Sequence, residues 1–421
     1  METLMTIHKK IQKRLWIVFF ATISFINLAA AVTAAEKKLT GTEAYSHSPA
    51  SYSLPSDVPE QMQQMTKIQK LTGTLRTSFV IHAGGDHLRI RISNETGKLP
   101  LIIDAASVAL ADEASHEAKT KPIAVTFGGD KSVIIPAGAP LVSDPVPLPT
   151  KALDRLVVNL YSPNGFDGVV LGGTGMMLAS GDQTLSKSLE DSKYIVGRSP
   201  VTGVTVEGSP DLPVIVTLGD SITDGSRIKA DQFAGYPSIL MQRLYNSKEG
   251  KKYSVVNAGI AGNRLLTTGW GENILSRLDR DVLRIPNVSH LIVLAGINDI
   301  GLGGSPLTKL EASASSEQLI AGYRQIIARA HAKGIKVIGA TLMPFKGAIY
   351  YTEDKDQQRL AVNAWIRNSG EFDVVIDFDA ITRDPTDNLR LNPAYDSGDH
   401  LHPSDEGYRA MGESIDLKVF N

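Results

Sequence analysis

The sequence predicts an α/β fold, in which a parallel sheet is covered by helices on both faces and is preceded by a smaller β-sandwich domain. From Pro213 onward, short apolar runs alternate with helical stretches, which is typical of parallel strands buried on both faces. From Thr72 to about Tyr161, short strand-like segments are separated by turn residues, which favours a sandwich. A chain of 421 residues, 42% of them hydrophobic, is long enough for two such domains.

The second half of the chain contains five apolar runs and four helical patterns. The runs predict strands at Val214–Leu218, Tyr253–Val256, His290–Ala295, Ile335–Thr341 and Val374–Ile376. The helices are expected at Pro237–Tyr245, Ser316–Lys333, Asp356–Asn368 and Asp405–Ile415. Ser316 is the expected N-cap of the clearest helix, and Gly334 is expected to end it. Catalytic residues are expected beyond the carboxyl ends of the strands, where parallel sheets bind ligands.

The first half reads as β-structure. Polar and apolar residues alternate in His87–Ile92, and shorter strands are predicted at Leu101–Ile103, Ile123–Phe127, Ser132–Ile135 and Leu156–Leu160. Residues 162–212 are rich in Gly and Ser and are expected to complete the sandwich. The predicted division is a signal peptide at 1–34, a lead-in segment at 35–70, the sandwich and linker at 71–212, and the α/β domain at 213–421.

The N-terminal residues have the three-part layout of a secretory signal peptide. Lys9, Lys10, Lys13 and Arg14 are followed by the apolar run Leu15–Ala31 and then by Val32-Thr33-Ala34, small residues suited to signal peptidase. The alternative is an uncleaved membrane anchor, for which the run is slightly short. We therefore expect export to the periplasm or the extracellular space. Without residues 1–34 the chain has 39 Lys+Arg and 44 Asp+Glu, net −5, which does not favour binding to anionic membranes.

Composition excludes several classes of function. The chain has no cysteine, so disulfides, thiolate nucleophiles and Cys-ligated zinc are excluded. A formal charge of −2 gives no support for a nucleic-acid partner, which would need a basic face. The sequence does not indicate the oligomeric state.

The first chemical motif is Gly219-Asp220-Ser221-Ile222-Thr223, directly after the first predicted strand. A serine hydroxyl there stands at a strand end and near a helix start, whose dipole favours developing negative charge. Taken alone, the motif is equally consistent with a turn or an N-cap.

Two further motifs follow the second and third strands. In Asn257–Asn263, a glycine can present its backbone N–H to an oxyanion. In Gly296-Ile297-Asn298-Asp299, the asparagine amide can donate to the same oxyanion. Each motif alone is also consistent with a turn or a helix cap.

The fourth motif is Asp399-His400-Leu401-His402-Pro403, just before the last helix. An Asp and a His three residues apart can face each other across one turn, so that Asp399 fixes the tautomer of His402 and stabilises its imidazolium. His400 is expected to point elsewhere. A buried structural role for His402 is the alternative, and the polar loop around it argues against that role.

In order and content, the four motifs resemble the SGNH/GDSL hydrolase superfamily, whose name lists Ser, Gly, Asn and His. The resemblance covers most of residues 213–421 and implies a flavodoxin-like three-layer domain. By position, Ser221 resembles the nucleophile and first oxyanion donor, Gly262 the second donor and Asn298 the third. His402 resembles the base and Asp399 its partner.

Three stretches, Asn257–Leu266, Gly296–Gly301 and Asp396–Tyr408, resemble the bacterial arylesterases and acylhydrolases often found with xylan-degrading enzymes. The β-rich stretch from about 72 to 160 also resembles the domain before the catalytic one in that group. The resemblance implies a serine esterase acting on O-acyl esters, short-chain ones or acetyl groups on carbohydrate, without a cofactor. A lipid esterase, lysophospholipase or thioesterase on the same triad and a non-catalytic carbohydrate-binding protein are the alternatives.

Two other readings of the polar residues are weaker. Asp377 and Asp379 follow a predicted strand and invite comparison with paired glycosidase carboxylates, but acids at this spacing are more often cap or loop residues. No His, Asp or Glu cluster has convincing metal-ligand spacing. The sequence therefore predicts neither a glycosidase nor a metal site.

Overall fold

The computed structural model describes residues 41–46, 48–49, 59–60, 70–112, 116–166, 175–208, 212–228, 235–247 and 252–420. The predicted signal peptide and most of the lead-in segment lie outside these residues. Residues Thr42–Asn421 form one compact unit. Among the residues described, no helix is both long and apolar enough to span a membrane.

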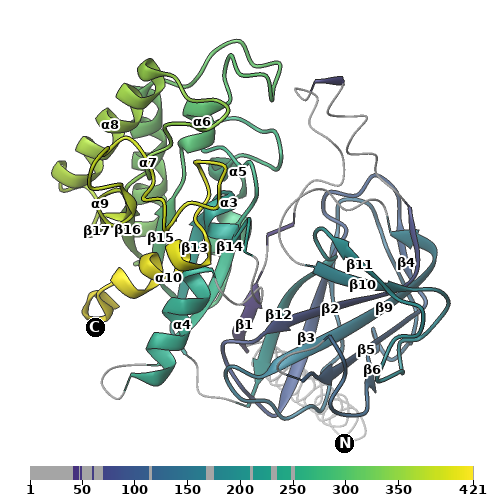
Figure 1. The fold of residues 1–421 in the computed structure, drawn as a ribbon. Coiled ribbons are helices and arrows are strands. Elements are labelled where there is room, and N and C mark those ends of the chain that lie inside the picture. Colours follow the sequence, from purple (N-terminus) through teal and green to yellow (C-terminus); the bar gives the residue numbers. More distant parts are fainter. Residues whose placement is uncertain are drawn as a thin grey trace, which may run out of the picture. The chain divides into compact units, whose positions relative to one another are not determined.

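The C-terminal half is built on one five-stranded sheet (Figure 1), whose strands all run parallel. The strands are β13 (Val214–Gly219), β14 (Ser254–Gly259), β15 (Val288–Leu294), β16 (Lys336–Ala340) and β17 (Val374–Ile376). Their order is β14-β13-β15-β16-β17. Each strand overlaps an apolar run of the sequence, and the predicted α/β fold is confirmed.

Eight α-helices are described in this half. They are α3 (Ser221–Asp224), α4 (Tyr236–Asn246), α5 (Ile274–Leu278), α6 (Ile297–Gly301), α7 (Ser316–His331), α8 (Glu353–Asn368), α9 (Phe378–Thr382) and α10 (Asp405–Ser414). A π-helical turn at Asp279–Leu283 and a 3-10 turn at Leu417–Phe420 complete them. The chain leaves β13 toward β14 on one side and later crosses to β15 on the other. Right-handed crossovers therefore place the connecting helices on opposite faces, and α4 packs on α10 while α7 packs on α8.

Helix α4 begins at Tyr236, one residue before the predicted start, and the starts of α7 and α8 also differ from those predicted. The N-cap of α7 is Ser315 rather than Ser316, because the Ser315 hydroxyl accepts from Gln318 N while the Gln318 side chain returns to Ser315 N. Helix α8 begins at Glu353, one turn before the predicted start, because Thr352 caps it. Its first turn is acidic, and apolar periodicity cannot reveal such a turn.

The N-terminal half consists of antiparallel sheets. The strands are β1 (Thr42–Ser46), β2 (Leu71–Val80), β3 (His87–Ser93), β4 (Leu101–Ile103), β5 (Ala105–Leu110), β6 (Ile123–Ala124), β7 (Val133–Ile135), β8 (Pro140–Val142), β9 (Arg155–Phe166), β10 (Gly175–Ala179), β11 (Lys193–Val196) and β12 (Val201–Glu207). A four-stranded sheet has the order β1-β12-β3-β8, a six-stranded sheet the order β11-β10-β2-β9-β5-β6, and β4 pairs with β7. Side chains of the two larger sheets share one apolar core. The predicted β-rich part is confirmed, while its boundary at 212/213 stays a prediction.

The sequence missed several of these strands and misjudged others. Strand β2 is buried along almost its whole length, so it lacks the alternation that betrays a half-buried strand. Strand β1 lies in the predicted lead-in segment and pairs with β12, which lies more than 150 positions later in the chain. The predicted strand Ile123–Phe127 ends at Ala124, since Phe127 forms a turn with Asp130 instead.

Candidate active site

Strand β13 carries Ser221 to the carboxyl edge of the sheet, where the strand order reverses. Gly219 is in register with Gly259 of β14 and Leu294 of β15, so three strand ends lie level. Asp220 then caps α3, its Oδ1 accepting from Ile222 N at 3.0 Å, and Ser221 is the first helical residue. This edge is where α/β sheets bind ligands.

Ser221, His402 and Asp399 form a continuous chain of hydrogen bonds. His402 Nε2 lies 2.8 Å from Ser221 Oγ, and His402 Nδ1 lies 2.8 Å from Asp399 Oδ2. Because Asp399 is an acceptor, the proton between them sits on Nδ1, which leaves Nε2 free to accept the serine proton. The structure thus brings His402 and Asp399 next to Ser221, although Ser221 and His402 are 181 positions apart in the sequence.

The turn between Asp399 and His402 is held by the same carboxylate. Asp399 Oδ1 accepts from Leu401 N at 3.1 Å and from His402 N at 2.9 Å. Burial opposes ionisation of Asp399, but the hydrogen bonds and charge of His402 outweigh it and hold the pKa of this carboxyl below its ordinary value. Asp399 is therefore a carboxylate at neutral pH, as the orienting partner of an imidazole must be.

Gly262, in the turn after β14, and Asn298, in the first turn of α6, are the predicted oxyanion donors. Gly262 has φ +72°, and a Cβ there would lie 2.7 Å from the Trp270 ring, so glycine is required. Asn298 lies in α6, is 4% exposed, and its Nδ2 donates to Asn263 O at 3.0 Å. This bond ties the Asn298 amide to the turn that carries Gly262 and leaves one amide hydrogen for another acceptor.

Two buried carboxyl groups support the site, Asp299 beside the glycine turn and Asp220 at the start of α3. Asp299 Oδ2 accepts from Leu265 N at 2.7 Å and its Oδ1 from Leu266 N at 3.0 Å, which fixes the chain after the glycine turn. Burial raises the pKa of Asp299 to about 6 and that of Asp220 to about 7. Neither support was predicted, although both acids stand inside the motifs that the sequence singles out.

His400 lies apart from the chain of hydrogen bonds that joins Ser221, His402 and Asp399. Its Nδ1 is 2.6 Å from Asp396 Oδ2, its side chain is 48% exposed, and its φ is +61°. The hydrogen bonds described for the His400 ring do not include one to Ser221. His400 is therefore hydrogen-bonded to Asp396, whereas His402 is hydrogen-bonded to Asp399.

Asp377 and Asp379 belong to an ion-pair network of α8 and α9. Arg367 binds both carboxylates, and Arg359, which is fully buried, binds Asp379 and Asp356. Asp377 also caps α9. Both carboxylates therefore form ion pairs with arginines. These pairs indicate a structural role for the two acids and give no support to a glycosidase pair.

The structure also shows one surface contact at the triad that the sequence did not reveal. Arg227 Nε lies 3.1 Å from Asp399 Oδ2, although the arginine side chain is mostly exposed. No spacing rule links positions 227 and 399. Among the described residues, no group of three or more His, Asp or Glu side chains is arranged to hold a metal ion.

Residues 217–410 match the sequence model of the GDSL-like lipase/acylhydrolase family. This range contains all five predicted site residues. Comparison with curated proteins gives no match.

Several solved structures are similar to about half of this chain. A GDSL-like lipase from Bacteroides thetaiotaomicron is 20% identical over 49% of this chain and 87% of its own, with a TM-score of 0.38. A member of the lipolytic G-D-S-L family from Veillonella parvula is 21% identical over 49% and 97%, with a TM-score of 0.36. The acetylxylan esterase Axe2 from Geobacillus stearothermophilus is 21% identical over 48% and 91%, with a TM-score of 0.38.

Proposed function

We propose that this chain is a serine esterase with Ser221 as nucleophile. Residues 217–410 match the GDSL-like lipase/acylhydrolase family, which supports a carboxylic ester hydrolase. His402 is the proposed base and Asp399 its orienting partner. The observation that carries this proposal is the contact of 2.8 Å between His402 Nε2 and Ser221 Oγ. At this distance the imidazole can take the hydroxyl proton directly.

The proposed reaction proceeds in two acyl-transfer steps. His402 Nε2 accepts the proton of Ser221 as Oγ attacks the ester carbonyl, and the carbonyl oxygen becomes an oxyanion. The backbone N–H groups of Ser221 and Gly262 and the side-chain amide of Asn298 donate to it. The imidazolium then protonates the leaving alcohol, and water, activated by His402, releases the acid from the acyl-serine. The proposed steps use only side chains, backbone and water.

The proposed substrates are short-chain O-acyl esters, with acetyl groups on carbohydrate as the first choice. The support is the likeness of Asn257–Leu266, Gly296–Gly301 and Asp396–Tyr408 to acylhydrolases found with xylan-degrading enzymes. A lipid esterase or thioesterase would use the same triad and differ in acyl-chain length and leaving group. A protein that only binds carbohydrate would not turn over any ester.

An ester panel tests this proposal directly. Purified protein is assayed on p-nitrophenyl esters from acetate to palmitate, on a lysophospholipid, on an acyl thioester and on acetylated xylan, beside Ser221→Ala as a matched control. We expect the highest kcat/KM on acetate, release of acetate from xylan, and no activity in the variant. A preference for palmitate or for the thioester would contradict the proposed substrate class. Inactivity on every ester would contradict the proposed esterase activity.

We also propose that the enzyme is exported and cleaved after Ala34, on the basis of the basic, apolar and small-residue order of residues 1–34. Expression of the full chain in a bacterial host, fractionation and N-terminal mass analysis test this. Mature protein beginning at Ala35 in the periplasm or medium is expected. Full-length protein in the membrane fraction would favour the anchor instead.

A further inference from the structure

Arg198, a residue of the β-rich half, contacts two elements next to Ser221, namely β14 and α3. It lies just before β12 and is 2% exposed. Its Nη1 donates to Ser48 O at 3.1 Å, and its Nη2 donates to Gly259 O at 3.0 Å and to Asp224 Oδ1 at 2.6 Å. One guanidinium therefore binds the N-terminal segment, the end of β14 and the end of α3.

The two elements that Arg198 joins on the hydrolase side are in close contact. Asp224 is the last residue of α3, the helix that begins at Ser221. A Cβ on Gly259 would lie 2.3 Å from Asp224 N, so α3 rests directly on the end of β14. Asn257 adds a bond from its Nδ2 to Thr223 O at 2.7 Å. The position of Ser221 thus depends on contacts at the other end of a helix only one turn long.

The ion pair between Arg198 and Asp224 is removed from water, with both side chains at most 3% exposed. Burial raises the pKa of Asp224 above its ordinary value, and Arg198 opposes this rise. Removing one member of a buried pair leaves the other charge uncompensated, which is far more costly than losing a surface pair. The end of α3 is therefore expected to move or to change protonation when Arg198 is absent.

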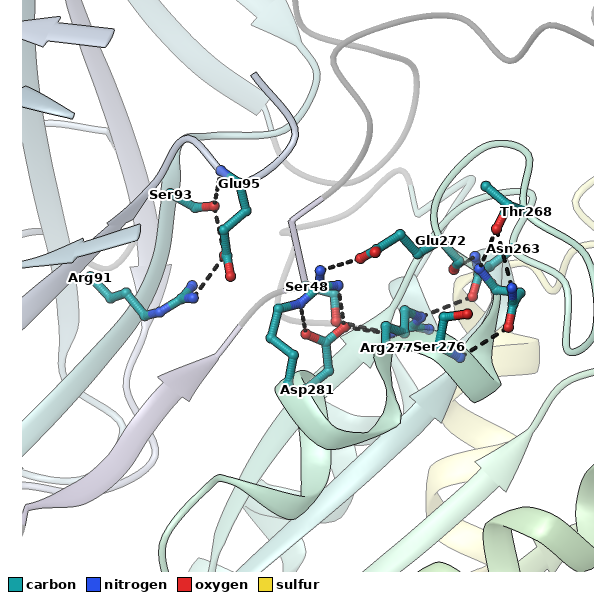
Figure 2. Close-up of polar contacts among 12 residues, drawn as sticks. Ser48, Arg91, Ser93, Glu95, Asn263, Thr268, Glu272, Ser276, Arg277 and Asp281 are labelled. Carbon is teal, nitrogen blue, oxygen red and sulfur yellow. Dashed lines mark hydrogen bonds and ion pairs between the residues drawn. The ribbon is translucent and has the colours of Figure 1, made fainter. Parts of the chain in front are cut away.

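Arg277 makes a parallel set of contacts on the oxyanion side. Figure 2 shows its guanidinium joined to Asn263, Ser48 and Asp281, at 3.0, 3.0 and 2.9 Å. Its Nη2 also donates to Gly219 O at 3.1 Å. Ser48 is thus bound twice, at its hydroxyl by Arg277 and at its carbonyl by Arg198. Ser48 is therefore bound by two arginines, and each of them also binds a segment of the site, Gly259 for Arg198 and Asn263 for Arg277.

Resting on the proposed esterase function, we propose that Arg198 is a positioning residue, through which the β-rich half completes the hydrolase site. It does not touch the ester. It fixes α3 against β14 and so fixes the direction of the Ser221 hydroxyl relative to His402 and the oxyanion donors. A displacement of about 1 Å at a reacting group can cost about a hundredfold in rate, so the contact matters for turnover as well as for stability.

Arg198→Met tests this proposal, with Arg198→Lys as the conservative variant. At a temperature where circular dichroism shows the variants folded, we expect kcat for Arg198→Met to fall by about 10- to 100-fold with KM changed less than about twofold. Labelling of Ser221 by a fluorophosphonate should slow in parallel. Arg198→Lys keeps a charge beside Asp224 and should recover part of both rates.

Arg76 provides a matched control. It is also almost fully buried, and its guanidinium donates to Asn159, Ser186, Lys187 and His116, all within the β-rich half. Arg76→Met is expected to lower Tm and leave kcat unchanged. A loss of kcat in Arg76→Met equal to that in Arg198→Met would show that only the stability of the β-rich half matters and would overturn the proposal.

A second variant covers the case in which Arg198→Met does not fold. Arg198→Met with Asp224→Asn removes the stranded charge, and the same loss of kcat is expected. Parental kcat and labelling in either folded variant would overturn the proposal. If the parent protein neither hydrolyses esters nor reacts with the label, the proposed function is contradicted, and this inference with it. If the parent is active and the Arg198 variant is unaffected, only this inference is contradicted.

Discussion

The half of the site that lies on the sheet and the half that lies on the C-terminal loop are held in different ways. Ser221 and Asn298 follow β13 and β15, and both are at most 6% exposed. His402 and Asp399 lie on a loop, with side chains 15% and 28% exposed. The contacts of this loop include hydrogen bonds to its own carboxylates, a bridge between Asp396 and Pro403, and the ion pair of Asp399 with Arg227.

This difference separates two tasks. Groups that stabilise developing charge are most effective when they are rigid and shielded from water, as strand ends allow. The proposed base, His402, must instead exchange protons with the leaving group and with water, which a partly exposed loop allows. We therefore expect variants of the sheet half to alter the transition state and variants of the loop half to alter proton transfer.

The largest effect is expected for Ser221→Ala, which removes the proposed nucleophile from the sheet half. We expect kcat to fall by roughly 10⁴- to 10⁶-fold, since the remaining groups cannot form an acyl-enzyme. Steady-state hydrolysis of p-nitrophenyl acetate measures it, with circular dichroism as the control for folding. Turnover near that of the parent would move the chemistry to another residue.

The loop half contains its own matched pair, His402 and His400. His402→Ala should lower kcat by about 10⁴-fold or more, because its ring is hydrogen-bonded to Ser221 Oγ and is the proposed base. His400→Ala should change kcat by less than about threefold, since its ring binds Asp396 and is half exposed. Both variants are assayed side by side, and the reverse ranking would exchange the roles of the two histidines.

The sequence correctly predicted that the strand-end motifs lie at one edge of the sheet, because each motif directly follows a buried strand; the roles of their residues stay predictions. All five strands of the parallel sheet overlap apolar runs, and their register places Gly219, Gly259 and Leu294 level. The three-residue spacing of Asp399 and His402 also identified the pair that the structure joins. A local sequence pattern was sufficient to predict the position of a polar group wherever that group lies in the same short segment as the strand or turn that positions it.

The sequence could not predict contacts that depend on distant segments. Strand β1 pairs with β12, and Arg198 reaches Asp224 and Gly259, without any local pattern that links these positions. The partners of the buried arginines are also poorly predicted, because they lie far away in the sequence, as Ser48 does from Arg277 and from Arg198. The β-rich half was therefore predicted only in outline.

A smaller but diagnostic effect is expected for Asn298→Ala in the sheet half. Its amide should donate to the oxyanion chiefly in the transition state, so we expect kcat to fall by roughly 100- to 1000-fold with KM little changed. Asn363→Ala is the matched control, since Asn363 is fully buried and its amide binds only the Leu342 backbone in the described contacts. That variant should lose Tm and keep kcat.

Kinetics and thermal denaturation on the same preparations separate the two roles of Asn298. If Asn298→Ala behaved like Asn363→Ala, with lower Tm and near-parental kcat, its amide would have only a structural role. The assignment of the sheet half as the oxyanion site would then rest on backbone donors alone.

The smallest effect is a pH dependence of stability that comes from Asp220. Burial raises its pKa from 3.8 to about 7, so the folded protein keeps a proton that the unfolded chain releases above about pH 4. Stability is therefore lost as pH rises from about 4 to 7. Asp220→Asn should remove this loss, so its Tm relative to the parent should rise by a few degrees between pH 5 and 8. A constant difference across this range would show that Asp220 is ionised in the folded protein.

Covalent labelling tests the central claim, that Ser221 is the nucleophile activated by His402, most directly. The parent, Ser221→Ala and His402→Ala are treated with a fluorophosphonate, and the adduct is located by peptide mass mapping. We predict one adduct per chain on Ser221 in the parent, none in Ser221→Ala and a strongly slowed reaction in His402→Ala. An adduct on another residue, or equal labelling of the parent and His402→Ala, would contradict the account.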